Sequence, residues 1–145
     1  MSEIHPIAVF IAALVGYFVG WTWYSPLLWQ KPWMAALGKT QTEWDEIGKK
    51  EMPKTIAYGF ATTLAISFAL AVFLNVVGVS TLLEAVQLGL LLCFSFVVTT
   101  KFTDMIYASP PPHWGRRAQQ LFLIDTGYQI LLFTLLSAII WKLSA

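Results

Sequence analysis

The composition of this 145-residue chain excludes an ordinary soluble domain. Hydrophobic residues make up 57% of the chain and charged residues only 12%, with a mean hydropathy of +0.66, whereas soluble domains carry about 25% charged residues. The net charge of +1 argues against a nucleic-acid partner, because nucleic-acid binding needs a dense basic face. These values indicate an integral membrane protein.

Neither a cofactor nor a metal is expected. Cys93 is the only cysteine, and disulfides, cysteine zinc sites and iron–sulfur clusters all need several thiolates. The two histidines, His5 and His113, are predicted to lie on opposite sides of the membrane. The sequence contains no nucleophile triad pattern, HExxH, P-loop or dinucleotide fingerprint. We therefore expect a protein that is not an enzyme.

Four apolar stretches are long enough to cross a bilayer as helices, which takes roughly 20 residues. They cover about residues 5–25, 54–77, 82–107 and 117–141. Pro26 is expected to end the first helix and Pro53 to precede the second, which Gly78 can end. The predicted fold class is all-α: a single integral membrane domain, built as a transmembrane four-helix bundle.

Residues 30–53 are predicted to form an interfacial loop with two short helices. Pro32 and Gly38 bracket the first helix, and the Thr40–Glu43 capping box begins the second, which is expected to stop before Gly48. These helices would lie on the membrane surface, with indole rings at headgroup depth. The plainer alternative is an aromatic belt beside a solvated loop.

The distribution of basic residues predicts the orientation. The loop between spans 1 and 2 and the flank of the loop between spans 3 and 4 hold nearly all of them: Lys31, Lys39, Lys49, Lys50, Lys54, Arg116 and Arg117. The opposite side has Lys142 and the N-terminal amine. Because basic loops stay in the cytoplasm, both termini are expected on the outer side of a bacterial cytoplasmic membrane.

Small residues recur every four positions in three of the spans. The rows are Ala8, Ala12, Gly16 and Gly20; Ala57, Ala61, Ala65 and Ala69; and Ala85, Gly89 and Cys93. Small residues let helices approach closely in lipid, so the first two rows predict a tight hairpin of spans 1 and 2. Alternatively, the first row faces another subunit. The small interior of four spans and the 15% aromatic content favour a homo-oligomer.

Ionisable residues at bilayer depth should be paired or face a cavity. Lys101 and Asp125 lie at similar depth on spans 3 and 4 and are predicted to form an ion pair. Asp104 is expected to pair with Lys101 or a nearby arginine, and Asp125 shares a helical face with Tyr128 and Gln129. The cluster either lines a cytoplasm-facing cavity for a small solute, ion or proton, or clasps the helices together.

The connection before span 4 contains a basic and aromatic group at the predicted headgroup plane. Trp114, Arg116 and Arg117 follow a polyproline stretch, and they are predicted to contact lipid headgroups. A rigid connector with an interfacial anchor is the alternative. A lipid-modifying enzyme that uses His113 with these arginines is a remoter one.

Two segments resemble an uncharacterised family of small bacterial four-span membrane proteins, a domain of unknown function. They are Gly20-Trp-Thr-Trp-Tyr-Ser-Pro-Leu-Leu-Trp-Gln-Lys-Pro-Trp-Met34 and Leu121-Phe-Leu-Ile-Asp-Thr-Gly-Tyr128. The resemblance implies four spans and a cytoplasmic-membrane location, and it supplies no activity. Members often have Asn at the positions of His5 and Asp125, which implies that the charge at position 125 belongs to this branch.

Two functions remain open on the sequence alone. In the first, a non-enzymatic membrane protein binds or transports a small solute, ion or lipid through the polar cluster on spans 3 and 4. In the second, a structural or assembly protein acts through helix packing and protein partners. Membrane lipids are expected partners in both.

Overall fold

The computed structural model describes residues 4–109 and 111–144, and no strand occurs among them. The helices are α1 (Pro6–Trp23), α2 (Gln30–Leu37), α3 (Gln41–Val77), α4 (Leu82–Leu92), η1 (Cys93–Val98), α5 (Thr99–Tyr107) and α6 (Arg116–Ser144). The π-helical η1 joins α4 and α5 into one rod. This rod, α1, α3 and α6 are each long and apolar enough to span a membrane, which confirms the all-helical fold.

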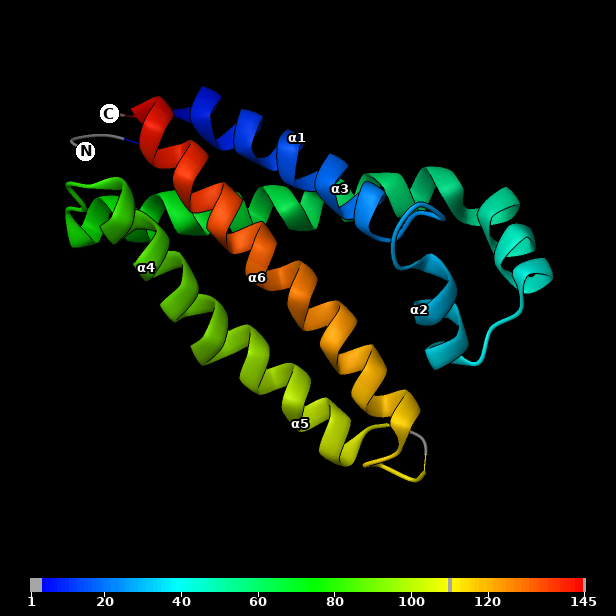
Figure 1. Cartoon of the computed structure of the whole chain (residues 1–145). Helices are drawn as coiled ribbons and strands as arrows, with labels where there is room; N and C mark the ends of the chain where they lie inside the picture. Colours follow the sequence, from blue (N-terminus) through cyan, green and yellow to red (C-terminus); the bar gives the residue numbers. More distant parts are fainter. Residues whose placement is uncertain (1–3, 110, 145) are drawn as a thin grey trace.

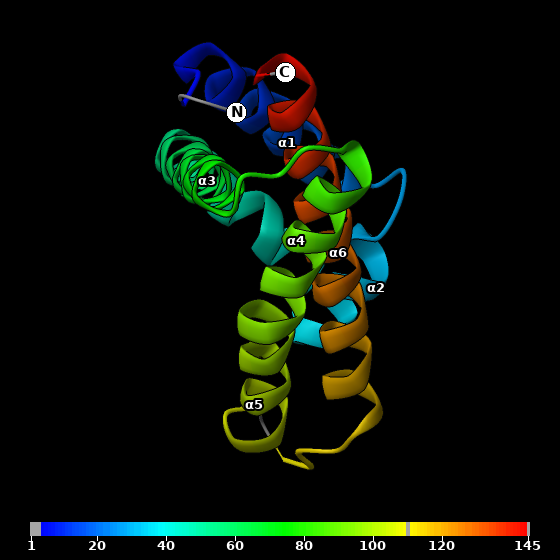
Figure 2. The ribbon, with the colours of Figure 1, turned by 90° about the vertical axis from the view of Figure 1, so that its left-hand side faces the viewer.

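Helix α6 forms the centre of the arrangement. It packs against α1, α2, α3 and the α4–α5 rod, and α1 packs in addition against α3. Figures 1 and 2 show the α4–α5 rod alongside α6, with α3 at a steep angle to both. The start of α1, the end of α6 and the α3–α4 turn lie at one end of the bundle in Figure 1. The opposite end carries α2 and the connection between α5 and α6.

The small-residue row of α1 is buried between its two neighbours. Ala12 is fully buried, and Gly16 and Gly20 are buried as well. A Cβ atom added to Gly16 would lie 2.7 Å from Leu132 of α6 and 3.2 Å from Thr63 of α3. Helices that pack in lipid gain stability mainly from such close contact. The row therefore holds α1 against α6 as well as α3.

The expected packing of the alanine row of α3 is wrong. Ala61 and Ala65, like Ala57 and Ala69, are exposed in this structure. The face of α3 that is buried instead carries Thr63, Ser67, Leu70, Ala71 and Leu74. Ser67 donates a 2.8 Å hydrogen bond to the carbonyl oxygen of Val9 in α1. The Ser67 hydroxyl thus links α3 to α1, because a polar group in an apolar bundle is buried where it finds a hydrogen-bond partner.

The row on α4 packs as a close contact with α6. Ala85 and Cys93 are fully buried, and Gly89 lies between them. A Cβ atom at Gly89 would collide with the Ser137 side chain and would lie 3.1 Å from the Phe133 carbonyl oxygen. Glycine is therefore required at this crossing.

The long helix α3 begins earlier than expected and passes through two residues that disfavour helix. The predicted capping box is present, since the Thr40 hydroxyl accepts from the Glu43 N–H and the Glu43 side chain accepts from the Thr40 N–H. The helix then continues through Gly48 and Pro53, so the expected stop before Gly48 is wrong. A glycine costs a helix only about 1 kcal/mol relative to alanine, and a proline can bend a helix without ending it. Figure 1 shows the first turns of α3 bent away from the remainder.

Candidate functional site

The carboxylate of Asp125 lies where α6 meets three other parts of the chain. Its Oδ1 atom accepts hydrogen bonds from the Tyr24 hydroxyl at 2.9 Å and from the Trp33 indole N–H at 3.1 Å. Its Oδ2 atom lies 3.5 Å from Nζ of Lys101 on α5. The expected pair of Lys101 and Asp125 is thus present, and it is the one ion pair among the described residues.

Two of these partners, Tyr24 and Trp33, were not anticipated from the sequence. Helix α1 ends at Trp23, and Tyr24 caps it before the turn that contains Pro26. The turn is closed by a hydrogen bond from the Trp29 N–H to the Trp23 carbonyl, after which α2 directs Trp33 at α6. Both residues lie in the segment Gly20–Met34, which carries the family resemblance. Their place in this motif was the signal in the sequence that could have pointed to them.

The first short helix packs on the bundle. Helix α2 packs against α6, and Gly38 ends it in a left-handed conformation with φ of 71°. The indole N–H of Trp33 points at the Asp125 carboxylate. A half-buried carboxylate strongly favours such a donor.

Aromatic rings surround the carboxylate. The Tyr24 ring lies 5.0 Å from Trp33 and 5.4 Å from Tyr128, measured between centroids. Trp44 stacks edge-on against Trp33 at 5.2 Å, and Nζ of Lys39 lies 5.7 Å above the Trp44 ring. Tyr128 thus contributes a wall of the cluster and makes no hydrogen bond to the described residues.

Two polar atoms within one turn of Asp125 on α6 lack hydrogen-bond partners among the described residues. They are Oε1 of Gln129 and Oγ1 of Thr126, and both atoms are buried. Residues 125, 126 and 129 lie within an arc of about 100° on a helix. The Gln129 carbonyl oxygen and the Thr126 hydroxyl, which can both donate and accept, therefore lie on the same side of α6 as Asp125.

The expected ion pair of Asp104 is wrong. Its side chain is exposed and lies in no ion pair with any described residue. Lys101 is directed at Asp125 on α6, so it does not serve Asp104. The Asp104 carbonyl instead accepts from the Ala108 and Ser109 N–H groups, which ends α5.

The three residues predicted to contact lipid headgroups point to different places. The Trp114 ring packs edge-on against Phe102 of α5 at 5.8 Å. A Cβ atom at Gly38 would lie 3.9 Å from the Arg117 guanidinium, which places this cation at the end of α2, where the helix dipole favours it. Arg116 lines a cavity described next, so the structure does not unite the three in one contact.

A cavity of about 580 Å³ lies on the neighbouring face of α6. The indoles of Trp23 and Trp29 form one wall, and the other is a strip of α6 made by Arg116, Gln119, Gln120, Leu123, Ile124 and Gly127. This volume lies in the range of ordinary small-molecule sites.

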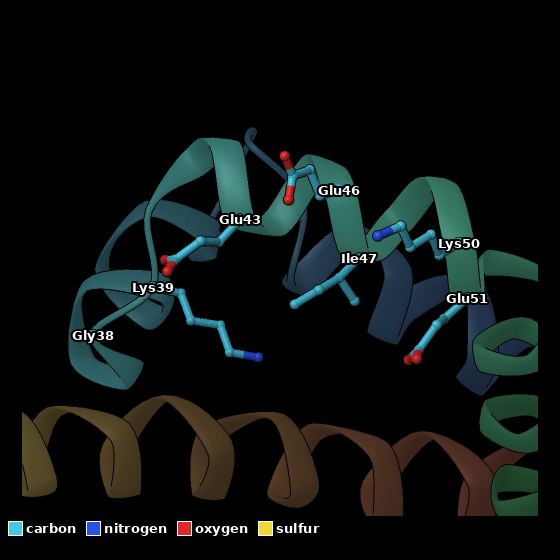
Figure 3. Close-up of a pocket in the computed structure, with 7 residues that line it drawn as sticks. All are labelled: Gly38, Lys39, Glu43, Glu46, Ile47, Lys50 and Glu51. Atoms are coloured by element: carbon cyan, nitrogen blue, oxygen red, sulfur yellow. The ribbon is translucent and has the colours of Figure 1, made fainter.

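A second hollow, of about 330 Å³, lies beside the first turns of α3 (Figure 3). Its lining mixes acidic and basic side chains: Lys39, Glu43, Glu46, Lys50 and Glu51, with Gly38 and Ile47. The Glu43 carboxylate turns back to accept from the Thr40 N–H at 2.8 Å, whereas that of Glu46 points away in Figure 3. Across the described residues, no three His, Cys, Asp or Glu side chains could hold a metal ion.

Comparisons with known proteins agree with the architecture. No curated protein and no solved structure matches the chain. One family does match, over residues 7–141, which includes every helix that builds the Asp125 cluster. The chain therefore belongs to the family described as "Protein of unknown function (DUF1761)".

Proposed function

We propose that this protein is a non-enzymatic, multi-pass membrane protein that binds or conducts a proton or small polar solute at the Asp125 cluster. The observation that carries the proposal is the surplus of acceptors there. Among the described residues, Asp125 Oδ2 has only the long 3.5 Å contact with Lys101 and Gln129 Oε1 has no donor, and the Thr126 hydroxyl also lacks a partner. Buried acceptors in a bilayer need donors, and a small polar occupant would provide them.

A route to the cluster is provided by Lys101. Its side chain is 39% exposed, whereas that of Asp125 is 17% exposed. Movement of the flexible lysine would therefore uncover one carboxylate oxygen while Tyr24 and Trp33 still hold the other. A carboxylate that can exchange one partner without losing its position suits a relay or a binding site.

The cellular setting belongs to the same proposal. We place the chain in a bacterial cytoplasmic membrane with both termini outside, supported by the basic loops at the end of the bundle that carries α2. We also propose a homo-oligomer, supported by the exposed alanine row on α3, because small residues suit contacts between spans.

Proton flux into liposomes that contain the purified protein tests the proposal. An acid pulse followed with an enclosed pH-sensitive dye should give faster acidification than in empty liposomes. Asp125→Asn should remove the difference, whereas Asp104→Asn should retain it, because Asp104 is exposed and unpaired among the described residues. A wild-type rate equal to that of empty liposomes would reject proton conduction.

The second candidate is a structural clasp, favoured by the two hydrogen bonds from Tyr24 and Trp33. In this case Asp125 fixes α1 and α2 on α6, and the folded surface serves protein partners in assembly. Its signature is an Asp125→Asn variant that is less stable than the wild type, together with no flux in either protein.

A further inference from the structure

The cavity beside α6 changes from polar to apolar along the helix axis. Arg116, Gln119 and Gln120 line it within the first two turns of α6, and Leu123, Ile124 and Gly127 line the next two. From residue 116 to residue 127 the helix rises about 16 Å. The order of the side chains is that of an amphipathic molecule lying along the helix with its polar end at Arg116.

The polar end of the groove is positively charged. Arg116 is the only charged residue in the lining, and no described acidic residue pairs with it. Gln119 is already committed, because its side-chain amide donates to the Trp114 carbonyl at 2.9 Å. The Arg116 guanidinium and the Gln120 amide therefore remain available, and a guanidinium matches phosphate oxygens with two parallel donors.

The apolar end is shaped by a fixed indole. Trp23 donates from its ring N–H to the Ile124 carbonyl at 3.2 Å, and its centroid lies 6.0 Å from that of Trp29. Gly127 lets the Trp23 ring pack directly against α6, since a Cβ atom there would lie 3.2 Å from that ring. Leu123 is 67% exposed along this edge, so an occupant with a hydrocarbon chain would cover it.

We propose that this groove binds one anionic phospholipid, with its phosphate at Arg116 and an acyl chain along Trp23, Leu123 and Gly127. A soluble anion would contact only the polar half of the groove, at Arg116. A phospholipid would contact both the polar and the apolar half. The location supports this choice, because Arg116 begins α6 at the end of the bundle where the basic loops lie. The groove lies outside the Asp125 cluster, so the inference does not depend on the proposed function.

Native mass spectrometry of the full-length protein released from nanodiscs provides the test. The nanodiscs contain equal amounts of phosphatidylglycerol and phosphatidylcholine with matched acyl chains. The wild type should retain one phosphatidylglycerol in preference to phosphatidylcholine. Arg116→Gln should lower that preference about fivefold, whereas the matched variant Arg117→Gln should change it little, because Arg117 does not line the groove.

A second variant tests the apolar half. Gly127→Val places a branched side chain against the Trp23 ring, which displaces this wall of the groove. It should reduce retention of both lipids while Arg116 is intact, and its melting temperature reports whether it has folded. Equal preference in the wild type and Arg116→Gln would overturn the proposal. Equal losses in Arg116→Gln and Arg117→Gln would overturn it too, as would displacement of the lipid by millimolar inorganic phosphate.

Discussion

The Tyr24 hydroxyl donates a 2.9 Å hydrogen bond to Oδ1 of Asp125 and so ties the end of α1 to α6. The same oxygen also accepts from Trp33 of α2. One carboxylate oxygen therefore fixes two neighbouring segments that are joined by a short turn, while the other oxygen faces Lys101.

Tyr24→Phe should destabilise the protein by about 1.5–3 kcal/mol, the usual value of a hydrogen bond to a charged group. Reversible unfolding in mixed micelles measures the change. Tyr17→Phe is the matched control, because Tyr17 is a half-buried residue of α1 whose hydroxyl has no hydrogen-bond partner among the described residues. Similar losses in the two variants would mean that the Tyr24 bond contributes little.

Trp33→Phe should loosen α2 more than the rest of the protein. The substitution keeps an aromatic ring and removes the N–H that binds Asp125. Hydrogen exchange of the amides of residues 30–37 should accelerate, with little change in α4. Trp44→Phe is the control, since Trp44 stacks on Trp33 but makes no hydrogen bond to it. The clasp interpretation would be wrong if both variants left α2 equally protected.

Two glycines should respond to alanine with opposite signs. Gly89→Ala places a methyl group against Ser137 and the Phe133 carbonyl, so α4 and α6 must separate, at a cost of about 1–3 kcal/mol. Gly48→Ala meets only the end of the flexible Met52 side chain, at 3.6 Å, and should stabilise the helix by roughly 0.5–1 kcal/mol. Thermal unfolding in detergent distinguishes the two, and a stable Gly89→Ala protein would contradict the packing described here.

The two small-residue rows should differ in their tolerance of leucine. Ala12→Leu should prevent folding or lower the melting temperature strongly, because Ala12 is fully buried between helices. Ala61→Leu should leave the melting temperature of the isolated protomer unchanged, since Ala61 is exposed. If the exposed row forms an interface between copies, cross-linking in membranes should show that Ala61→Leu reduces the oligomer.

The start of α3 should weaken at acid pH. Hydrogen bonds from the Thr40 backbone N–H and the Thr40 hydroxyl lower the pKa of Glu43 below its ordinary value of 4.5. A lowered pKa means that the stabilisation is complete above 4.5 and is lost as the pH falls through the pKa of the folded state. Amide protection factors of residues 41–47 should therefore fall below pH 4.5. Glu43→Gln should flatten this dependence, and Glu46→Gln should not.

Local chemistry in the sequence determined most of the helices. The lengths of the apolar stretches predicted four spans, and Gly38, Gly78 and the Thr40–Glu43 box end or begin helices as expected. These features act within a few residues, so they can be seen without tertiary contacts. The local rules failed in α3, where Gly48 and Pro53 weaken the helix without ending it. They also failed at the start of α2, which begins at Gln30, two residues before Pro32.

Only the tertiary structure decided which helix faces are buried. A span that is apolar all round has no periodic signal to identify its inner face. From the sequence, the face with Ala61 could therefore be buried as readily as the face with Ser67, and only the positions of the other helices distinguish them. The partners of Asp125 were hidden for a related reason. Lys101 could be matched by depth on two adjacent spans, whereas Tyr24 lies 101 positions from Asp125 and reaches it only because α1 and α2 both pack on α6.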